Sequence, residues 1–191
     1  YTVKWGGAFE NQRRAYTRLA VIIPLTLMCM FILLYATFGK FRQAGLVLLI
    51  VPLALFGGML ALNVRGMTLN VSSAVGFIAM FGLSIQNGII MVSQINGLRR
   101  TGMELRQSVV EGARQRFRPI LMTSVTTILG LFPASMATGI GSDVQRPLAT
   151  VIVYGLMFAT LVSMFVLPVF YYLVENRVFI KKKNDENELT I

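Results

Sequence analysis

The 191-residue chain has no histidine, one cysteine and few charged residues, which make up 14% of the sequence. The single Cys29 supports neither a disulfide framework nor a thiolate metal site. We therefore expect no catalytic residues, no cofactor and no metal site in this chain, and no enzyme. The net charge of +10 is explained in a membrane protein by topology and anionic headgroups, so we expect no nucleic-acid partner.

What the chain has instead is apolar sequence, with 55% hydrophobic residues and a mean hydropathy of +0.67. These values lie outside the range of soluble domains, and about 20 uncharged residues suffice for one membrane crossing. The sequence thus predicts an all-α membrane protein, partnered by the lipid bilayer. Its five spans are expected at residues 19–38, 44–63, 71–98, 120–138 and 148–174.

Two shorter segments flank the expected transmembrane bundle of residues 11–175. In residues 1–10, Tyr1, Val3 and Trp5 alternate with more polar residues, which is typical of the end of a strand from an outer domain. Residues 176–191 form a charged tail that we expect to be largely disordered. Because the chain opens on Tyr1 rather than Met, we expect it to be a piece of a longer polypeptide.

The polar segment 102–117 is expected to form an amphipathic helix at the inner membrane surface. Thr101 and Glu104 have the spacing of a capping box. Apolar residues then recur at steps of four, while three arginines are expected to point away from that face. The apolar residues are Leu105, Val109, Ala113 and Phe117, and the arginines are Arg106, Arg114 and Arg116.

The basic residues predict the orientation, because short cytoplasmic loops carry the Lys and Arg excess. Most of them fall on one side: Lys40 and Arg42, the six arginines of residues 99–118, and the tail. That side is expected to be the cytoplasm. The N-terminus is then periplasmic and the C-terminus cytoplasmic.

Residues 71–98 carry polar groups on two sides of one apolar span. At 100° per residue, Ser84, Asn87, Met91 and Gln94 share one stripe with Gly88, and Gly82, Gln86 and Ser93 share the opposite stripe. Amide groups in hydrocarbon need partners, so we expect this helix to be central. We pair it with span 120–138 through the stripe Thr123, Thr127, Gly130 and Ala134, and expect helix packing at Gly82, Gly88 and Gly130.

None of the five spans contains Asp, Glu, Lys, Arg or His in its interior. Intramembrane ionisable groups are the usual proton carriers in transporters. If the parent protein is driven by protons, its titrating carboxylates are expected outside this chain, which would supply amides and hydroxyls around them.

Three long motifs occur in order: GFIAMFGLSIQNGIIMVSQI, EGARQRFRPILMTSVTTILGLFP and GIGSDVQRPLATVIVYGLMFATLVSMFVLPVFYYL. Together they resemble the last third of resistance-nodulation-division (RND) efflux pumps, most closely the heavy-metal-efflux branch. The resemblance implies that the five spans are helices eight to twelve of a twelve-helix subunit. It also implies a homotrimer in the bacterial inner membrane, in which proton influx drives metal cations toward a periplasmic adaptor and an outer-membrane channel.

The resemblance also suggests which residues surround the proton relay. Gln86 stands where drug exporters have a lysine and copper exporters a glutamate, whereas Thr123 and Arg116 match the drug exporters. Asn87 and Gly88 agree with the zinc, cobalt and cadmium exporters. Our hypothesis is that Gln86, Asn87 and Thr123 hydrogen-bond around carboxylates of the fourth helix and set their pKa. The alternative is that these side chains only tie helices together.

Three functions remain open at this stage. The first is the membrane portion of a heavy-metal cation/proton antiporter. The second is a drug or amphiphile exporter of the same superfamily, favoured by the wording RPILMTS, and the third is a membrane scaffold module without transport. The eleven methionines would suit Cu(I), but they are also common fillers of apolar packing, which we favour.

Overall fold

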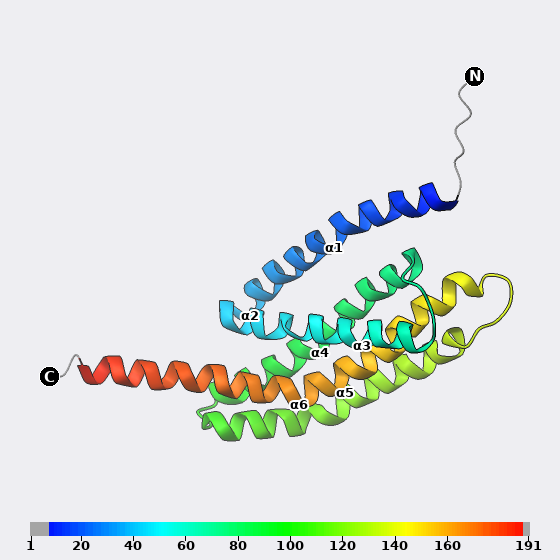
Figure 1. Ribbon diagram of the computed structural model, residues 1–191. Coiled ribbons are helices and arrows are strands. Elements are labelled where there is room, and N and C mark those ends of the chain that lie inside the picture. Colours follow the sequence, from blue (N-terminus) through cyan, green and yellow to red (C-terminus); the bar gives the residue numbers. More distant parts are fainter. Residues whose placement is uncertain (1–7, 189–191) are drawn as a thin grey trace.

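The computed structural model describes residues 8–188, which form six helices joined by short turns (Figure 1). In chain order these are α1 (Ala8–Phe38), α2 (Phe41–Leu48), α3 (Ile50–Val64), α4 (Val71–Arg100), α5 (Leu105–Ser135) and α6 (Ser142–Glu188). They supply five segments long and apolar enough to cross a membrane, with α2 and α3 making one. The all-α membrane fold is confirmed for these residues. The strand predicted around Tyr1, Val3 and Trp5 lies outside them.

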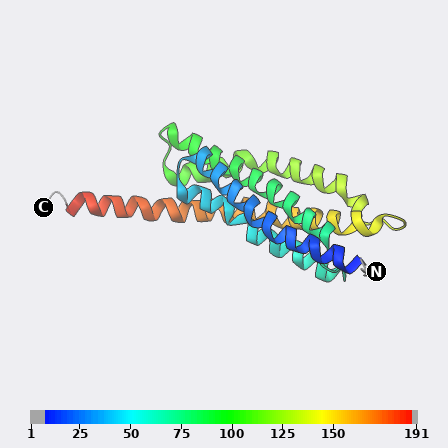
Figure 2. The same cartoon turned by 90° about the horizontal axis from the view of Figure 1, so that it is seen from above.

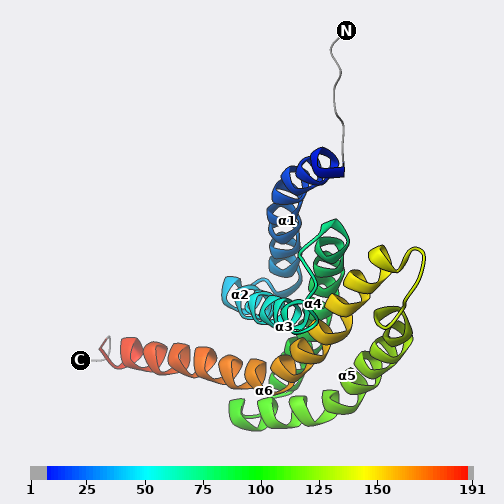
Figure 3. The same cartoon turned by 45° about the vertical axis from the view of Figure 1, so that its right-hand side comes forward.

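Helices α4 and α6 occupy the centre of the bundle. Within the described chain α4 contacts all five other helices, and α6 contacts α2, α3, α4 and α5. Helix α1 lies at one side and contacts α2 and α4 (Figures 1 and 3). In its apolar segment 6% of residues are buried, against 56% in α4 and 67% in α6. The central position predicted for residues 71–98 is therefore confirmed.

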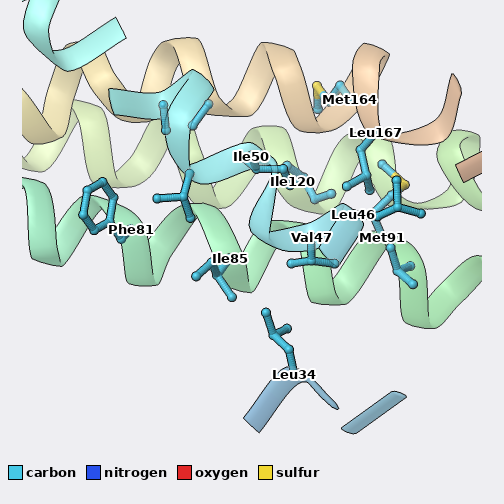
Figure 4. Packing of buried hydrophobic residues seen from close by; sticks show 14 of the residues in the cluster. Leu34, Leu46, Val47, Ile50, Phe81, Ile85, Met91, Ile120, Met164 and Leu167 are labelled. Atoms are coloured by element: carbon cyan, nitrogen blue, oxygen red, sulfur yellow. The ribbon is translucent and has the colours of Figure 1, made fainter. Parts of the chain in front are cut away.

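Apolar side chains from neighbouring helices fill the interior between them (Figure 4). Phe81 and Met91 of α4 and Val47 and Ile50 of the α2–α3 segment are almost completely buried there. Small residues set how closely α6 approaches α4, because a Cβ added at Gly76 would lie 2.9 Å from the carbonyl oxygen of Leu148. Such contacts supply the packing that holds helices together in lipid.

The second span is broken at Leu49, between α2 and α3. Pro52 lies in the first turn of α3, where its missing N–H leaves no helical hydrogen bond unmade. Its ring disfavours a continuous helix because it would press on the carbonyl of Leu48. The break at Leu49 therefore falls three residues before the proline, directly after the carbonyl on which the ring would press.

Side chains fix the connection from α3 to α4. Asn70 caps α4 by accepting a hydrogen bond from the backbone N–H of Ser73, whose hydroxyl in turn accepts from the N–H of Asn70, both at 2.8 Å. In the preceding turn, the Arg65 guanidinium donates to the carbonyl of Ser135 at 2.9 Å and to the hydroxyl of Thr150 at 3.3 Å. These contacts tie the turn to the end of α5 and the start of α6.

The amphipathic segment and the fourth span form one helix, α5, rather than two elements. Val109 and Ile120, eleven residues apart, are both buried, and that spacing places them on the same face of a continuous helix. Packing on both sides of Pro119 offsets the backbone hydrogen bond that the proline removes. Figure 3 shows that α5 is curved, which a proline within a helix permits.

The capping box predicted from Thr101 and Glu104 is wrong. Helix α5 begins at Leu105, and Glu104 at its N-cap makes no side-chain capping bond. The hydroxyl of Thr101 instead donates to the carbonyl of Leu98 at 2.7 Å, within the end of α4. Gly102, with φ of +86°, turns the chain between the helices and separates Thr101 from the start of α5.

Helix α6 is longer at both ends than the predicted span 148–174. It begins at Ser142, after a turn through Gly139 and Gly141, and has Asp143 in its first turn, where a carboxylate favours the helix N-terminus. The other end continues to Glu188 beyond the rest of the bundle (Figure 2). The expected disorder of residues 176–188 is therefore wrong for the backbone. This stretch has no glycine or proline and contains strong helix formers.

Candidate functional site

A chain of polar side chains crosses the middle of the bundle and joins three helices. Asn87 of α4, 7% exposed, donates from its amide to the hydroxyl of Ser124 on α5 at 3.5 Å. The hydroxyls of Ser124 and Thr160 on α6 lie 2.8 Å apart and share a hydrogen bond. These groups lie in the apolar parts of their spans, where a polar group without a partner is costly.

A small cavity of about 50 Å³ opens beside this polar chain. Its polar lining comes from two helices and includes three of the predicted site residues, Gln86, Asn87 and Thr123. The complete lining is Leu83, Gln86, Asn87, Ile90, Thr123, Ser124, Thr127 and Leu156. A space of this size holds about one or two water molecules.

The two sides of α4 differ in how far they are covered. Ser84, Asn87 and Met91, on the first predicted stripe, are buried by other helices. On the opposite stripe, Gln86 and Ser93 are exposed and Gly82 is partly exposed. The described residues therefore provide neighbours for one polar side of α4 and leave the other side open.

The stripe predicted on α5 is rotated by about one residue from the face that meets α4. Thr123 is exposed, and its hydroxyl donates to the carbonyl of Pro119 within the same helix at 2.6 Å. Thr127 bonds back in the same way to Thr123, at 2.9 Å. The contact to α4 is made by Ser124, whose position on the buried face of Ile120 was the available sequence signal.

Arg116 lies apart from the other predicted site residues. Its guanidinium donates two hydrogen bonds to the side-chain oxygen of Gln94 on α4, at 3.0 and 2.6 Å. Arg116 was expected to point away from the apolar face of this segment, and the structure shows that its guanidinium reaches α4. The two hydrogen bonds to one amide oxygen link the first half of α5 to the last turns of α4.

Of the three glycines expected at helix contacts, Gly88 has close neighbours. A Cβ added there would lie 2.8 Å from a carbon of Ile50 and 2.9 Å from one of Val47. At Gly82 and Gly130 an added Cβ would meet nothing within 4 Å in the described structure. The structure therefore shows no close packing of described helices at Gly82, nor at Gly130, where packing on the central helix was expected.

A second polar cluster, which the sequence reasoning missed, joins α2, α4 and α6 near the start of α2. We name this set the glutamine cluster; its members are Gln43, Asn96, Arg99, Tyr171 and Glu175. The amide of Asn96 donates to Gln43 at 2.8 Å, and the hydroxyl of Tyr171 donates to Asn96 at 2.6 Å. Gln43 is 1% exposed and Tyr171 is completely buried.

The two charged members of the glutamine cluster, Glu175 and Arg99, form an ion pair at its edge. Glu175 accepts a hydrogen bond from the amide of Gln43 at 3.1 Å and pairs with Arg99 at 3.0 Å. The sequence did carry a signal, because Asn96 and Arg99 are three residues apart and Tyr171 and Glu175 four apart. Each pair therefore shares one helix face. Gln43 gives no such signal, because it lies just before the expected span 44–63 and has no polar neighbour on its own helix face.

A model of the AcrB/AcrD/AcrF family matches residues 1–175 of the chain. The chain belongs to this family. It is 44% identical over 177 residues to the cobalt-zinc-cadmium resistance protein CzcA of Cupriavidus metallidurans, covering 93% of this chain and 17% of that protein. A crystal structure of a heavy metal efflux pump is 56% identical, with a TM-score of 0.80, over 91% of this chain and 17% of that chain.

A toluene efflux pump is less similar to the chain than the metal-resistance proteins are. The toluene efflux pump membrane transporter TtgB of Pseudomonas putida is 29% identical over 97% of this chain and 18% of its own length. The resemblance to the heavy-metal branch of the RND pumps is thus confirmed, and the chain is part of a multi-pass inner-membrane protein. It spans about a sixth of the length of the relatives it matches.

Proposed function

We propose that the chain is the C-terminal membrane portion of a proton-driven heavy-metal cation efflux transporter. The observation that carries the proposal is the half-covered polar site around Asn87, in a chain 44% identical to a cobalt-zinc-cadmium resistance protein. Gln86 and Thr123 open toward a side of α4 that the described residues do not cover. A polar face in the middle of a span needs a polar neighbour rather than lipid.

In the proposed mechanism that neighbour carries the titrating carboxylates. An ionised carboxylate accepts hydrogen bonds, whereas a protonated one also donates, so proton binding changes which contacts with Gln86, Asn87 and Thr123 are favourable. Amide and hydroxyl donors stabilise the ionised form and lower the pKa of the carboxylate. Protonation would then weaken the contact between the two helices, which couples proton entry to movement and catalyses no covalent reaction.

The remaining features of the proposal follow the family. The pump would be a homotrimer with a periplasmic adaptor and an outer-membrane channel, and the N-terminus of this chain would be periplasmic. The basic residues favour that orientation because Lys40, Arg42 and the arginines of residues 99–118 gather at one end of the spans.

A drug or amphiphile exporter is the second candidate, supported by the 29% identity to a toluene efflux pump. The cavity beside Asn87 does not discriminate between the two, because a proton site serves either cargo. The higher identity to metal-resistance proteins favours the metal.

The deciding test is the tolerance of an efflux-deficient bacterium that expresses the protein from its own gene. Cells would be challenged in parallel with zinc, cobalt, cadmium, copper, silver and lipophilic drugs. We expect protection against metals, and its loss in Asn87→Leu at unchanged expression. Protection against drugs alone would move the protein to the second candidate. Unchanged tolerance in Asn87→Leu would refute the role of Asn87, and no protection at all would favour a scaffold.

A further inference from the structure

A groove of about 620 Å³ runs between the first half of α5 and the second half of α6. Its walls are apolar except for one charged residue, Arg106. The lining residues from α5 are Arg106, Val109, Val110 and Ala113, and those from α6 are Met164, Phe165, Pro168, Val169 and Tyr172. The volume lies within the range of pockets that hold small molecules, and the apolar walls suit an alkyl chain.

Arg106 also lines a second groove of about 590 Å³ on its other side. This groove carries two carboxylates, Glu104 and Glu111, together with Met103, Gln107 and Val110. Across the surface the order is therefore an apolar channel, then a guanidinium, then two carboxylates. The two grooves meet at Arg106 and Val110.

These charges have no strong ion-pair partner in the part of the chain that the structure describes. Arg106 and Glu104 are exposed and have no ion-pair partner among the described residues. Glu111 accepts a hydrogen bond from the side-chain amide of Gln115 at 2.9 Å, which leaves its second oxygen facing Arg114 at 4.0 Å. That arginine side chain is 82% exposed, so the ion pair is weak. The surface therefore offers one cation and two anions, in a fixed order, to a ligand.

We propose that the paired grooves bind a phospholipid with an ethanolamine headgroup. An acyl chain would lie against Val109, Ala113 and Phe165, the phosphate would accept hydrogen bonds from Arg106, and the ammonium would donate to Glu104 and Glu111. The order of groups in the lipid matches the order on the protein. A glycerol headgroup has no cation for the carboxylates, and a choline headgroup has no N–H to donate.

The place in the bundle fits a lipid that lies at the membrane surface. Arg106 lies in the second residue of α5, just after the turn from α4. Phe165 and Val169 beside the apolar groove are 63% and 56% exposed, as side chains that face lipid tails would be. The arginine therefore lies at the end of an apolar surface, where phosphate groups gather.

The test measures lipid retention by native mass spectrometry on the protein expressed from its own gene and purified. Phosphatidylethanolamine, phosphatidylglycerol and phosphatidylcholine would be added in turn. We expect one additional phosphatidylethanolamine to be retained in preference to the others. Arg106→Gln should reduce retention roughly fivefold, which corresponds to about 1 kcal/mol of binding free energy, because it removes the charged donor to the lipid phosphate. Arg118→Gln, an exposed arginine outside both grooves, should change nothing.

Two further variants separate the parts of the site. The double variant Glu104→Gln and Glu111→Gln should abolish the preference over phosphatidylglycerol, and Ala113→Phe should reduce all three lipids alike by narrowing the groove. Unchanged thermal melting of Arg106→Gln would exclude misfolding as the cause of its loss. Equal retention of the three lipids by the wild type, equal effects of Arg106→Gln and Arg118→Gln, or no retained lipid would each overturn the proposal.

Discussion

The two polar regions of the bundle differ in completeness. In the glutamine cluster, Gln43 is buried and hydrogen-bonded to groups on α4 and α6, and an ion pair closes the set. In the site around Asn87, a long 3.5 Å bond reaches Ser124, while Gln86 remains exposed beside a cavity. The polar groups of the glutamine cluster are hydrogen-bonded to one another, whereas the site around Asn87 has a polar side chain, Gln86, with no partner among the described residues. We infer that the cluster stabilises the fold and that the open site is available for function.

Replacing Gln43 by leucine tests the closed region and should have the largest effect on stability. The change leaves the partly buried Asn96 and the carboxylate of Glu175 without one of their partners, although Tyr171 and Arg99 still bond to them. We expect a loss of about 1–3 kcal/mol in the free energy of unfolding, the range for a polar group that loses its partner within a protein. Thermal unfolding of the purified protein measures it. A stability equal to that of the wild type would show that the glutamine cluster does not stabilise the fold.

The same substitution at Gln86 tests the open region. Gln86 is exposed and has no hydrogen bond among those found for the described residues, so stability should change by less than about 0.5 kcal/mol. Metal tolerance should fall roughly 3- to 30-fold if Gln86 makes one interhelical hydrogen bond worth about 0.6–2 kcal/mol in the pump. Dose-response curves at matched expression measure this. If Gln86→Leu lowered the stability of the protein but left metal tolerance unchanged, Gln86 would have a structural role and our assignment would be wrong.

The smallest expected effect separates two neighbouring residues of α5. Ser124→Ala removes the group that links Asn87 to Thr160, and should cost about 1 kcal/mol. Thr123→Ala removes a hydroxyl that bonds its own helix, and should leave stability almost unchanged. Paired melting curves of the two variants decide between them. A larger loss for Thr123→Ala would restore the helix face that the sequence predicted.

Hydropathy predicted the spans well because it depends on composition within a single helix. Boundaries were less accurate, since the signals there compete with packing. The change from a polar to an apolar sequence predicted separate elements at 102–117 and 120–138, but burial of Val109 and Ile120 on one face keeps α5 continuous. Likewise Asp143 sets the start of α6 earlier than the apolar run does.

The candidate site was predicted in part. Periodicity placed Asn87 toward other helices, and the structure brings it together with Gln86 and Thr123 around one cavity. It did not place Arg116, whose partner Gln94 comes from another helix. Nor did it find Gln43, because the four residues that complete its cluster are 53 or more positions away along the chain.

The sequence by itself determined the helical class, the five apolar spans and the two polar sides of α4. These properties depend on local composition and on the fixed angle of 100° between successive residues of a helix. The tertiary structure decided which of those sides is covered, that Ser124 rather than Thr123 reaches Asn87, and that Gln43 meets Glu175. Those outcomes depend on the rotation and depth of one helix against another, which side-chain packing sets only when the helices come together.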